Sequence, residues 1–166
     1  MKKRVLVFAL LLATLSASTH AFAALSAAER ELLRGLDGFR LAVERIKPEI
    51  ERDGLFRETL QTDMELRLRL AGIKVLTEEE AQATPDAPLL YLNADALKCS
   101  FGYVYNIGLY LIESVTTVRR PMKARATLLR IPEHLGIASR LSDVRDAAGD
   151  ILDEFVNAWK DANSKP

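Results

Sequence analysis

Residues 142–162 carry an apolar stripe at helical spacing, and a stripe of this size needs a broad apolar surface to cover it. Its members recur every three or four positions, the spacing that places side chains on one face of an α-helix. They are Val144, Ala147, Ala148, Ile151, Leu152, Phe155, Val156 and Trp159, while Asp143, Asp146, Asp150, Glu154 and Asp161 fall on the opposite face. We therefore predict an amphipathic helix that begins with Ser142 as its N-cap, ends near Ala162, and packs on a sheet.

The segments before this helix are rich in β-forming residues. Leu89–Cys99 and Tyr103–Val118 are joined by only three residues, which predicts an antiparallel hairpin. Lys123–Ile131 predicts a third strand, and Pro132 is expected to end it because proline lacks the backbone N–H that a sheet needs. These strands would supply the apolar surface that the C-terminal helix requires.

The first half of the chain alternates helical and extended patterns. Ser26 and Glu29 form a capping box, which predicts a short helix to about Leu36. A strand is expected over 39–46 and a helix over 58–71, followed by a strand over 73–77 and a polar loop over 78–88. The apolar side of the helix consists of Leu60, Met64, Leu68 and Ala71, and Gly72 is expected to end it. The order strand, helix, strand predicts two parallel strands.

These elements predict an α/β fold, a two-layer sandwich in which a mixed sheet of about five strands carries its helices on one face. The other face would remain open. Ile107, Leu109 and Leu111 continue the parity of Tyr103 and Tyr105, so this set is expected to face the core. The opposite parity includes Val104, Tyr110 and Ile112, which we predict to lie on the open face as a partner surface.

The N-terminus has the three-part pattern of a secretory signal peptide. Lys2, Lys3 and Arg4 precede an apolar run over 5–15, and Ala21 and Ala23 are the small residues that signal peptidase needs. The apolar run is about half the length that spans a bilayer. The sequence therefore predicts a signal peptide over 1–23 and a single α/β domain over 24–166, exported to the periplasm as a soluble protein without a lipid anchor or membrane span.

The net charge limits the classes of binding partner, and the cysteine content limits the disulfides that the chain can form. The predicted signal carries three of the 23 basic residues and none of the 23 acidic ones, so the remaining chain has a net charge of −3. This balance gives no overall electrostatic footprint for nucleic acid or for an anionic membrane. Cys99 is the only cysteine, so no disulfide within the chain is possible, and its place at the end of an apolar strand favours an inert buried thiol.

The chain resembles a family of small exported bacterial proteins of unknown function. The residues that carry the resemblance are Gly35–Phe39, Val43–Glu44, Asp53–Leu55, Leu60–Arg69, Ala71–Ile73, Val75–Leu76, Pro88–Asn93 and Tyr103–Tyr105. The element order is also similar, at the level of the fold, to small periplasmic domains of the TolB N-terminal and CsgG-like kind. The family resemblance implies export and no reaction, and the fold likeness implies an adaptor in an envelope assembly.

No pattern in the sequence singles out a catalytic or metal site. His134 is the only histidine after the predicted signal, and it is expected in a surface loop with no second ligand at suitable spacing. We therefore predict no cofactor and a non-enzymatic adaptor that binds an envelope protein or a second copy of itself. Two alternatives stay open: a carrier of a small apolar ligand or lipid, with a pocket between helices and sheet, and a hydrolase that uses two carboxylates.

The signal pattern generates the first testable prediction. We expect cleavage between Ala23 and Ala24, because Ala21 and Ala23 occupy the small-residue positions before the cut. Intact-mass spectrometry of the protein recovered from the periplasm measures the new N-terminus. A full-length species retained in the inner membrane would contradict the prediction.

Overall fold

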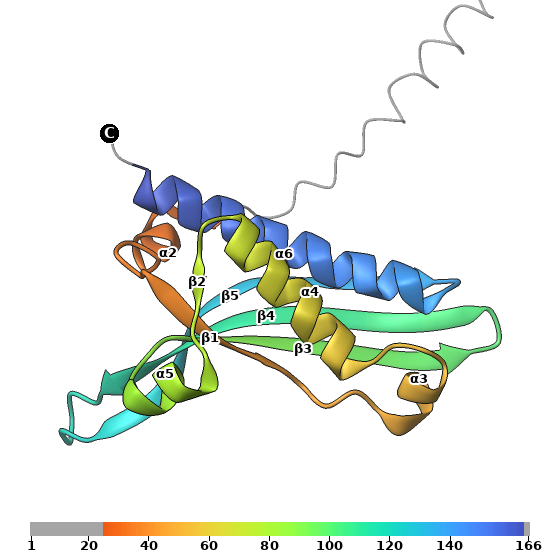
Figure 1. Ribbon diagram of the computed structural model, residues 1–166, viewed down its shortest axis with the longest axis horizontal. Coiled ribbons are helices and arrows are strands. Elements are labelled where there is room, and N and C mark those ends of the chain that lie inside the picture. Colours follow the sequence, from red (N-terminus) through yellow and green to blue (C-terminus); the bar gives the residue numbers. More distant parts are fainter. Residues whose placement is uncertain (1–24, 165–166) are drawn as a thin grey trace, which may run out of the picture.

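The computed structural model describes residues 25–164, which form a two-layer α/β sandwich (Figure 1). One layer is a five-stranded sheet in the order β2-β1-β3-β4-β5. Its strands are β1 (Gly38–Val43), β2 (Lys74–Val75), β3 (Leu89–Cys99), β4 (Gly102–Thr116) and β5 (Lys123–Ala138). The helices are α2 (Ala27–Glu31), α3 (Pro48–Arg52), α4 (Arg57–Leu70), α5 (Glu78–Ala83) and α6 (Leu141–Asn163). The predicted fold class is confirmed, and the predicted signal peptide lies outside the described residues.

The sheet is mixed, as the sequence predicts. β1 pairs in parallel with β2 and with β3, while β3, β4 and β5 form an antiparallel meander. The hairpin of β3 and β4 closes over the short link that the sequence indicates, with Cys99 opposite Gly102. The meander therefore provides three long neighbouring strands for a helix to cover.

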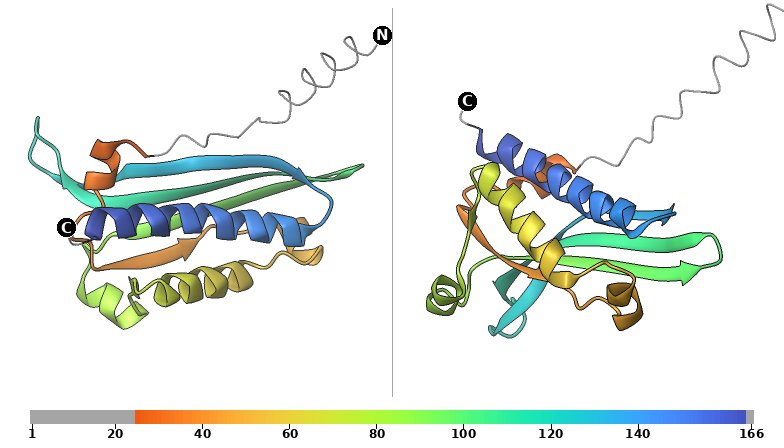
Figure 2. Two further views of the ribbon diagram at one scale, coloured as in Figure 1. Left: turned by 90° about the horizontal axis from the view of Figure 1, so that it is seen from above. Right: turned by 45° about the vertical axis from the view of Figure 1, so that its right-hand side comes forward.

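Helices α4 and α6 lie side by side on one face of this sheet (Figure 2). The apolar stripe of α6 is buried from Val144 to Val156, and Phe155 meets Phe39 of β1 edge to face with 5.4 Å between the ring centroids. Ile107 and Leu109 of β4 are fully buried beneath the helices, which confirms the predicted core parity. Buried aromatic and aliphatic side chains of this kind supply most of the free energy that favours folding.

Trp159 and Asn163, at the end of α6, hold the segment that follows α2. The Trp159 indole N–H donates to the Leu36 carbonyl at 2.8 Å, and the Asn163 amide donates to the Leu33 carbonyl at 2.9 Å. The Asn163 side-chain oxygen also accepts from the Gly35 amide at 2.8 Å. Trp159 is thus half-buried at the edge of the core, where its polar N–H has a partner.

Several predicted boundaries in the first half of the chain need correction. α2 has the predicted capping box but ends at Glu31, well before Leu36. Lys47 and Pro48 were expected only to end the preceding strand, but Pro48 also begins α3. It occupies the first turn of that helix, where its missing N–H costs nothing. α4 and the positive φ of Gly72 agree with the prediction, but β2 is only two residues long.

The segment 78–88 is not wholly a loop. Its first residues form α5, capped by Thr77, whose hydroxyl accepts from the Glu80 amide while the Glu80 side chain accepts from the Thr77 amide. This is a second capping box, and its spacing was readable in the sequence. At the other end of the chain, Arg140 rather than Ser142 is the N-cap of α6, and Ser142 lies inside the first turn.

Strand β5 continues past Pro132, contrary to the prediction that proline would end it. The register changes there, because Ile107 pairs with His134 whereas Leu109 pairs with Ile131. Pro132 and Glu133 together oppose Gly108, which is a β-bulge. β5 is the last strand in the sheet order, and proline is tolerated on an edge strand at a bulge because no ladder hydrogen bond depends on its nitrogen.

The core contacts generate the second prediction. Phe155→Ala should lower the free energy of unfolding by about 3–5 kcal/mol, because it removes a fully buried ring and leaves a cavity. Phe101→Ala is the matched control, since Phe101 lies exposed in the β3–β4 turn and should change stability by less than about 0.5 kcal/mol. Urea unfolding followed by circular dichroism measures both. Equal losses in the two variants would show that α6 does not pack as described.

Candidate functional site

The open face of the sheet is the surface that the two long helices leave uncovered. Alternation along β4 sends Ile107, Leu109 and Leu111 under the helices and sends Val104, Tyr110 and Ile112 to the other side. The views along and across the sheet show α4 and α6 on the opposite side (Figures 1 and 2). The predicted partner surface therefore lies on this open face, and its polar and apolar parts are separate.

An apolar row crosses one end of the open face. It consists of Leu97, Val104 and Ile137, which are direct cross-strand neighbours on β3, β4 and β5. Their exposed fractions are 62%, 36% and 67%, although all three are large hydrophobic residues. Leu135, two residues before Ile137 on β5 and on the same face, is also exposed. Contiguous exposed apolar side chains on a regular sheet are typical of an interaction surface.

A tyrosine band lies further along the same face. It consists of Glu44, Tyr91, Asn93, Tyr110, Arg130 and Glu133. Tyr91 and Tyr110 are cross-strand neighbours with ring centroids 6.5 Å apart. Tyr91 donates its hydroxyl hydrogen bond to Glu44, and the Asn93 amide donates to the same carboxylate oxygen at 2.9 Å.

The second half of the band repeats this arrangement on β4 and β5. The Tyr110 hydroxyl donates to Glu133 at 2.9 Å, and the Arg130 guanidinium pairs with Glu133 at 3.3 Å. Arg130 also lies over the Tyr110 ring, with 5.1 Å from its central carbon to the ring centroid. Each phenol therefore has a carboxylate acceptor, so the band presents ordered ring faces and ordered charge.

The hydrogen bonds of the band shift the pKa values of its groups. The Tyr91 hydroxyl, and secondly Asn93, lower the pKa of Glu44 below its ordinary value. The same bond to Glu44, with burial, raises the pKa of Tyr91 to about 12. Burial first, and then the bond to Glu133, raises the pKa of Tyr110. Glu44 is thus held as a carboxylate that accepts hydrogen bonds, which does not suit it to donate a proton as a general acid.

The predicted surface residues divide between these two features. Val104 belongs to the apolar row, Tyr110 belongs to the tyrosine band, and Ile112 is half-buried beyond the band. Sequence reasoning missed Leu97 and Ile137. Leu97 could have been predicted from the sequence, since counting back from the short link of the hairpin places it opposite Val104. Ile137 could not, because its segment was expected to lie beyond the last strand.

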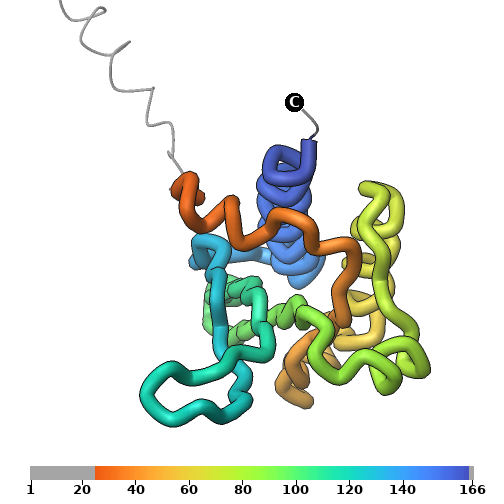
Figure 3. Tube along the Cα trace, turned by 90° about the vertical axis from the view of Figure 1, so that its left-hand side faces the viewer, coloured from red at the N-terminus to blue at the C-terminus, as the bar shows by residue number. Residues whose placement is uncertain are grey.

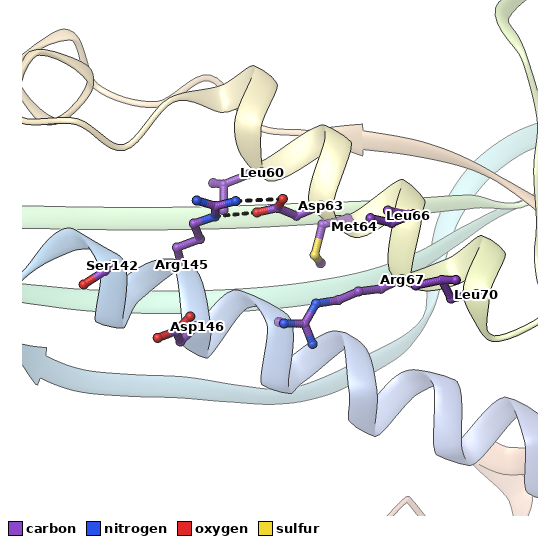
Figure 4. A pocket seen from close by; sticks show the side chains of 10 residues that line it. Leu60, Asp63, Met64, Leu66, Arg67, Leu70, Ser142, Arg145 and Asp146 are labelled. Atoms are coloured by element: carbon purple, nitrogen blue, oxygen red, sulfur yellow. Dashed lines mark hydrogen bonds and ion pairs between the residues drawn. The ribbon is translucent and has the colours of Figure 1, made fainter.

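A helix groove on the other side of the molecule is a candidate pocket for a carrier. It has a volume of about 270 Å³ and lies between α4 and α6 (Figure 4). Arg145 pairs with Asp63 and Arg67 pairs with Asp153, so each arginine ties the two helices together. A side chain at Gly149 would require the Arg67 guanidinium to move, since its Cβ would lie 2.6 Å from Nη2.

This groove differs from the pocket expected between helices and sheet. Its apolar lining includes the buried Leu60 and Met64 and the exposed Leu66 and Leu70. The exposed leucines place it between the helices at the solvent surface. Leu60 and Met64, which line its inner side, belong to the hydrophobic core.

The remaining residues with potential chemistry lie away from the open face or at its end. His134 is in β5, not in a surface loop, and its side chain is 10% exposed and contacts the Glu154 carboxylate on α6 at 3.0 Å. Cys99 is half-buried rather than buried, and its thiol donates to the Gly102 carbonyl at 3.2 Å. Within residues 25–164, no three His, Cys, Asp or Glu side chains converge as a metal site, and no helix is long and apolar enough to cross a membrane.

Comparison with known proteins adds no relative, since no protein-family model, curated protein or solved structure matches the chain.

The tyrosine band generates the third prediction. In an alkaline titration followed by phenolate absorbance, one tyrosine should ionise near pH 12, because ionising Tyr91 breaks its bond to Glu44. Its raised pKa means that Tyr91 contributes stability at pH values below about 10 and that this contribution is lost as the pH rises toward 12.

Two variants test the assignment. Tyr91→Phe should remove the late step, and Glu44→Gln should shift the Tyr91 step toward about 10 because the acceptor charge is gone. Circular dichroism at each pH establishes that the fold persists during the titration. A parent protein whose tyrosines all ionise at a pH of about 10 while folded would contradict the described bond.

Proposed function

We propose that the protein is a non-enzymatic binding or adaptor domain that acts in the periplasm through its open face. On this proposal a partner protein or a second copy docks against the apolar row. The single observation that carries it is the cross-strand alignment of Leu97, Val104 and Ile137, which leaves three large apolar side chains exposed side by side. Covering them would remove apolar surface from water, which favours association.

The surroundings of the row support the same proposal. Asp95, on the same face of β3, is paired with Lys47 at 2.9 Å, so a polar pair borders the row. Tyrosines and arginine follow in the tyrosine band, and these residue types are enriched where proteins meet. An apolar centre with a hydrogen-bonded polar border is the usual composition of an interface. The resemblance to exported proteins, and the fold-level likeness to envelope adaptors, favour a partner in the cell envelope.

The helix groove favours the carrier as a second candidate. It combines apolar side chains on α4 with two arginines, which suits an apolar ligand that has an anionic group. Both arginines already pair with carboxylates, so an anionic ligand would have to displace Asp63 or Asp153. The apolar row has no such competing contact, and it is therefore the stronger site.

The fourth prediction tests the apolar row. Leu97→Asp and Ile137→Asp should each weaken association at least tenfold, because a carboxylate at either position would have to lose its water in the interface. Sedimentation velocity of the purified protein measures self-association, and cross-linking in the native envelope followed by mass spectrometry measures partner capture. Both side chains are exposed, so circular dichroism should show an unchanged fold.

Leu70→Asp is the matched control, since Leu70 is an equally apolar, exposed residue that lines the helix groove instead. It should leave association unchanged. If the row variants keep every complex and Leu70→Asp loses the capture of an apolar ligand, the carrier replaces the adaptor as the better proposal.

A further inference from the structure

The hairpin tip that joins β4 and β5, residues 116–123, is the most exposed apolar feature of the described chain. Val118 is 98% exposed and Met122 is 60% exposed. The tip projects from the end of the sheet, away from α6, and stands apart from α5 in the end-on view (Figure 3). Apolar side chains on a projecting turn gain nothing from the protein's own core and are free to contact another surface.

The tip is nevertheless an ordered structure. The Thr117 amide donates to the Met122 carbonyl at 3.1 Å, and the Thr117 hydroxyl donates to the Arg120 carbonyl. These two bonds close the turn around Pro121 and fix the positions of Val118 and Met122. The apolar side chains are therefore presented on a defined turn.

The tip also concentrates positive charge. Arg119, Arg120, Lys123 and Arg125 occur within seven residues, and residues 114–130 contain no acidic residue. Lys123 pairs with Asp86, and Arg125 contacts backbone carbonyls, whereas Arg119 and Arg120 lie exposed at the end of the turn. The net charge of −3 that remains after the predicted signal thus coexists with a basic end.

The size of the tip argues for one kind of partner. A stable protein–protein interface uses about 20–30 residues on each side, far more than this turn offers. A lipid surface requires less, because a few apolar side chains can enter the headgroup region while basic side chains meet the phosphates. The tip supplies both kinds of side chain, with charge complementary to an anionic bilayer.

We propose that the hairpin tip docks on the surface of an anionic phospholipid bilayer, with Val118 and Met122 entering the headgroup region and Arg119 and Arg120 contacting lipid phosphates. This surface is separate from the apolar row, since Val104 lies near the start of β4 and Thr116 ends it, about 40 Å along an extended strand. The molecule can therefore contact a membrane at one end and a partner at the other.

The test is co-sedimentation with phospholipid vesicles. The form that begins at Ala24, the predicted cleavage product, is used. The hydrophobic core described above is built from residues within 25–164, and the apolar run over 5–15 would itself bind lipid. It should bind vesicles that contain about one quarter phosphatidylglycerol, should not bind pure phosphatidylcholine, and should bind less as salt is raised.

Variants separate the two contributions. Arg119→Gln with Arg120→Gln should weaken vesicle binding about thirtyfold, and Val118→Asp should weaken it more than tenfold. Phe101→Asp is the matched control, since Phe101 is an exposed apolar residue in the β3–β4 turn, at the opposite end of β4 from the hairpin tip. This variant should bind vesicles as the parent does. Circular dichroism establishes that each variant is folded.

Three results would overturn the proposal. The first is a parent protein that does not bind anionic vesicles. The second is a folded Val118→Asp variant that binds them within twofold of the parent. The third is binding to soluble polyglutamate that depends on the arginines in the absence of vesicle binding, which would assign the tip to an acidic protein. Failure of vesicle binding would not contradict the proposed function of the apolar row, because the variants of the row are measured without lipid.

Discussion

The packing of α6 against the meander is the interaction on which the rest of the structure depends. Its buried stripe covers β4 and β5, and Phe155 reaches β1 through Phe39, so one helix joins the antiparallel and parallel parts of the sheet. Its last turn then holds the segment after α2 through Trp159 and Asn163. With α6 and α4 both on this side, the opposite face of the sheet is left to water, and the candidate interaction surface exists because of that asymmetry.

Hydrophobic periodicity made most of this architecture predictable. The α6 stripe, the α4 stripe and the β3–β4 hairpin each agree with the structure, because buried faces impose periods of 3.6 and 2 on the sequence. The missed elements are short or interrupted. α3 and α5 are each held by end effects rather than by a long stripe, and β5 passes through Pro132 because a bulge at the sheet edge removes the usual penalty.

The candidate site was only partly predictable for a related reason. The side of the sheet on which Val104 and Tyr110 lie follows from alternation within one strand, and the sequence carries that information. Their neighbours depend on the register between strands that are separated along the chain. The bulge at Pro132 sets that register for β5, and so it decides that Ile137 rather than another residue stands beside Val104. Likewise, Glu44 meets Tyr91 only because β1 lies beside β3.

The same bulge also affects how readily the chain aggregates through the edge of its sheet. β5 is long and outermost, so its outer backbone groups could recruit the strand of another molecule and begin a growing stack. Pro132 lacks a donor at the middle of that edge, and the extra residue twists the strand away from a flat template. An interrupted edge therefore lets many copies of the chain fold side by side without polymerising.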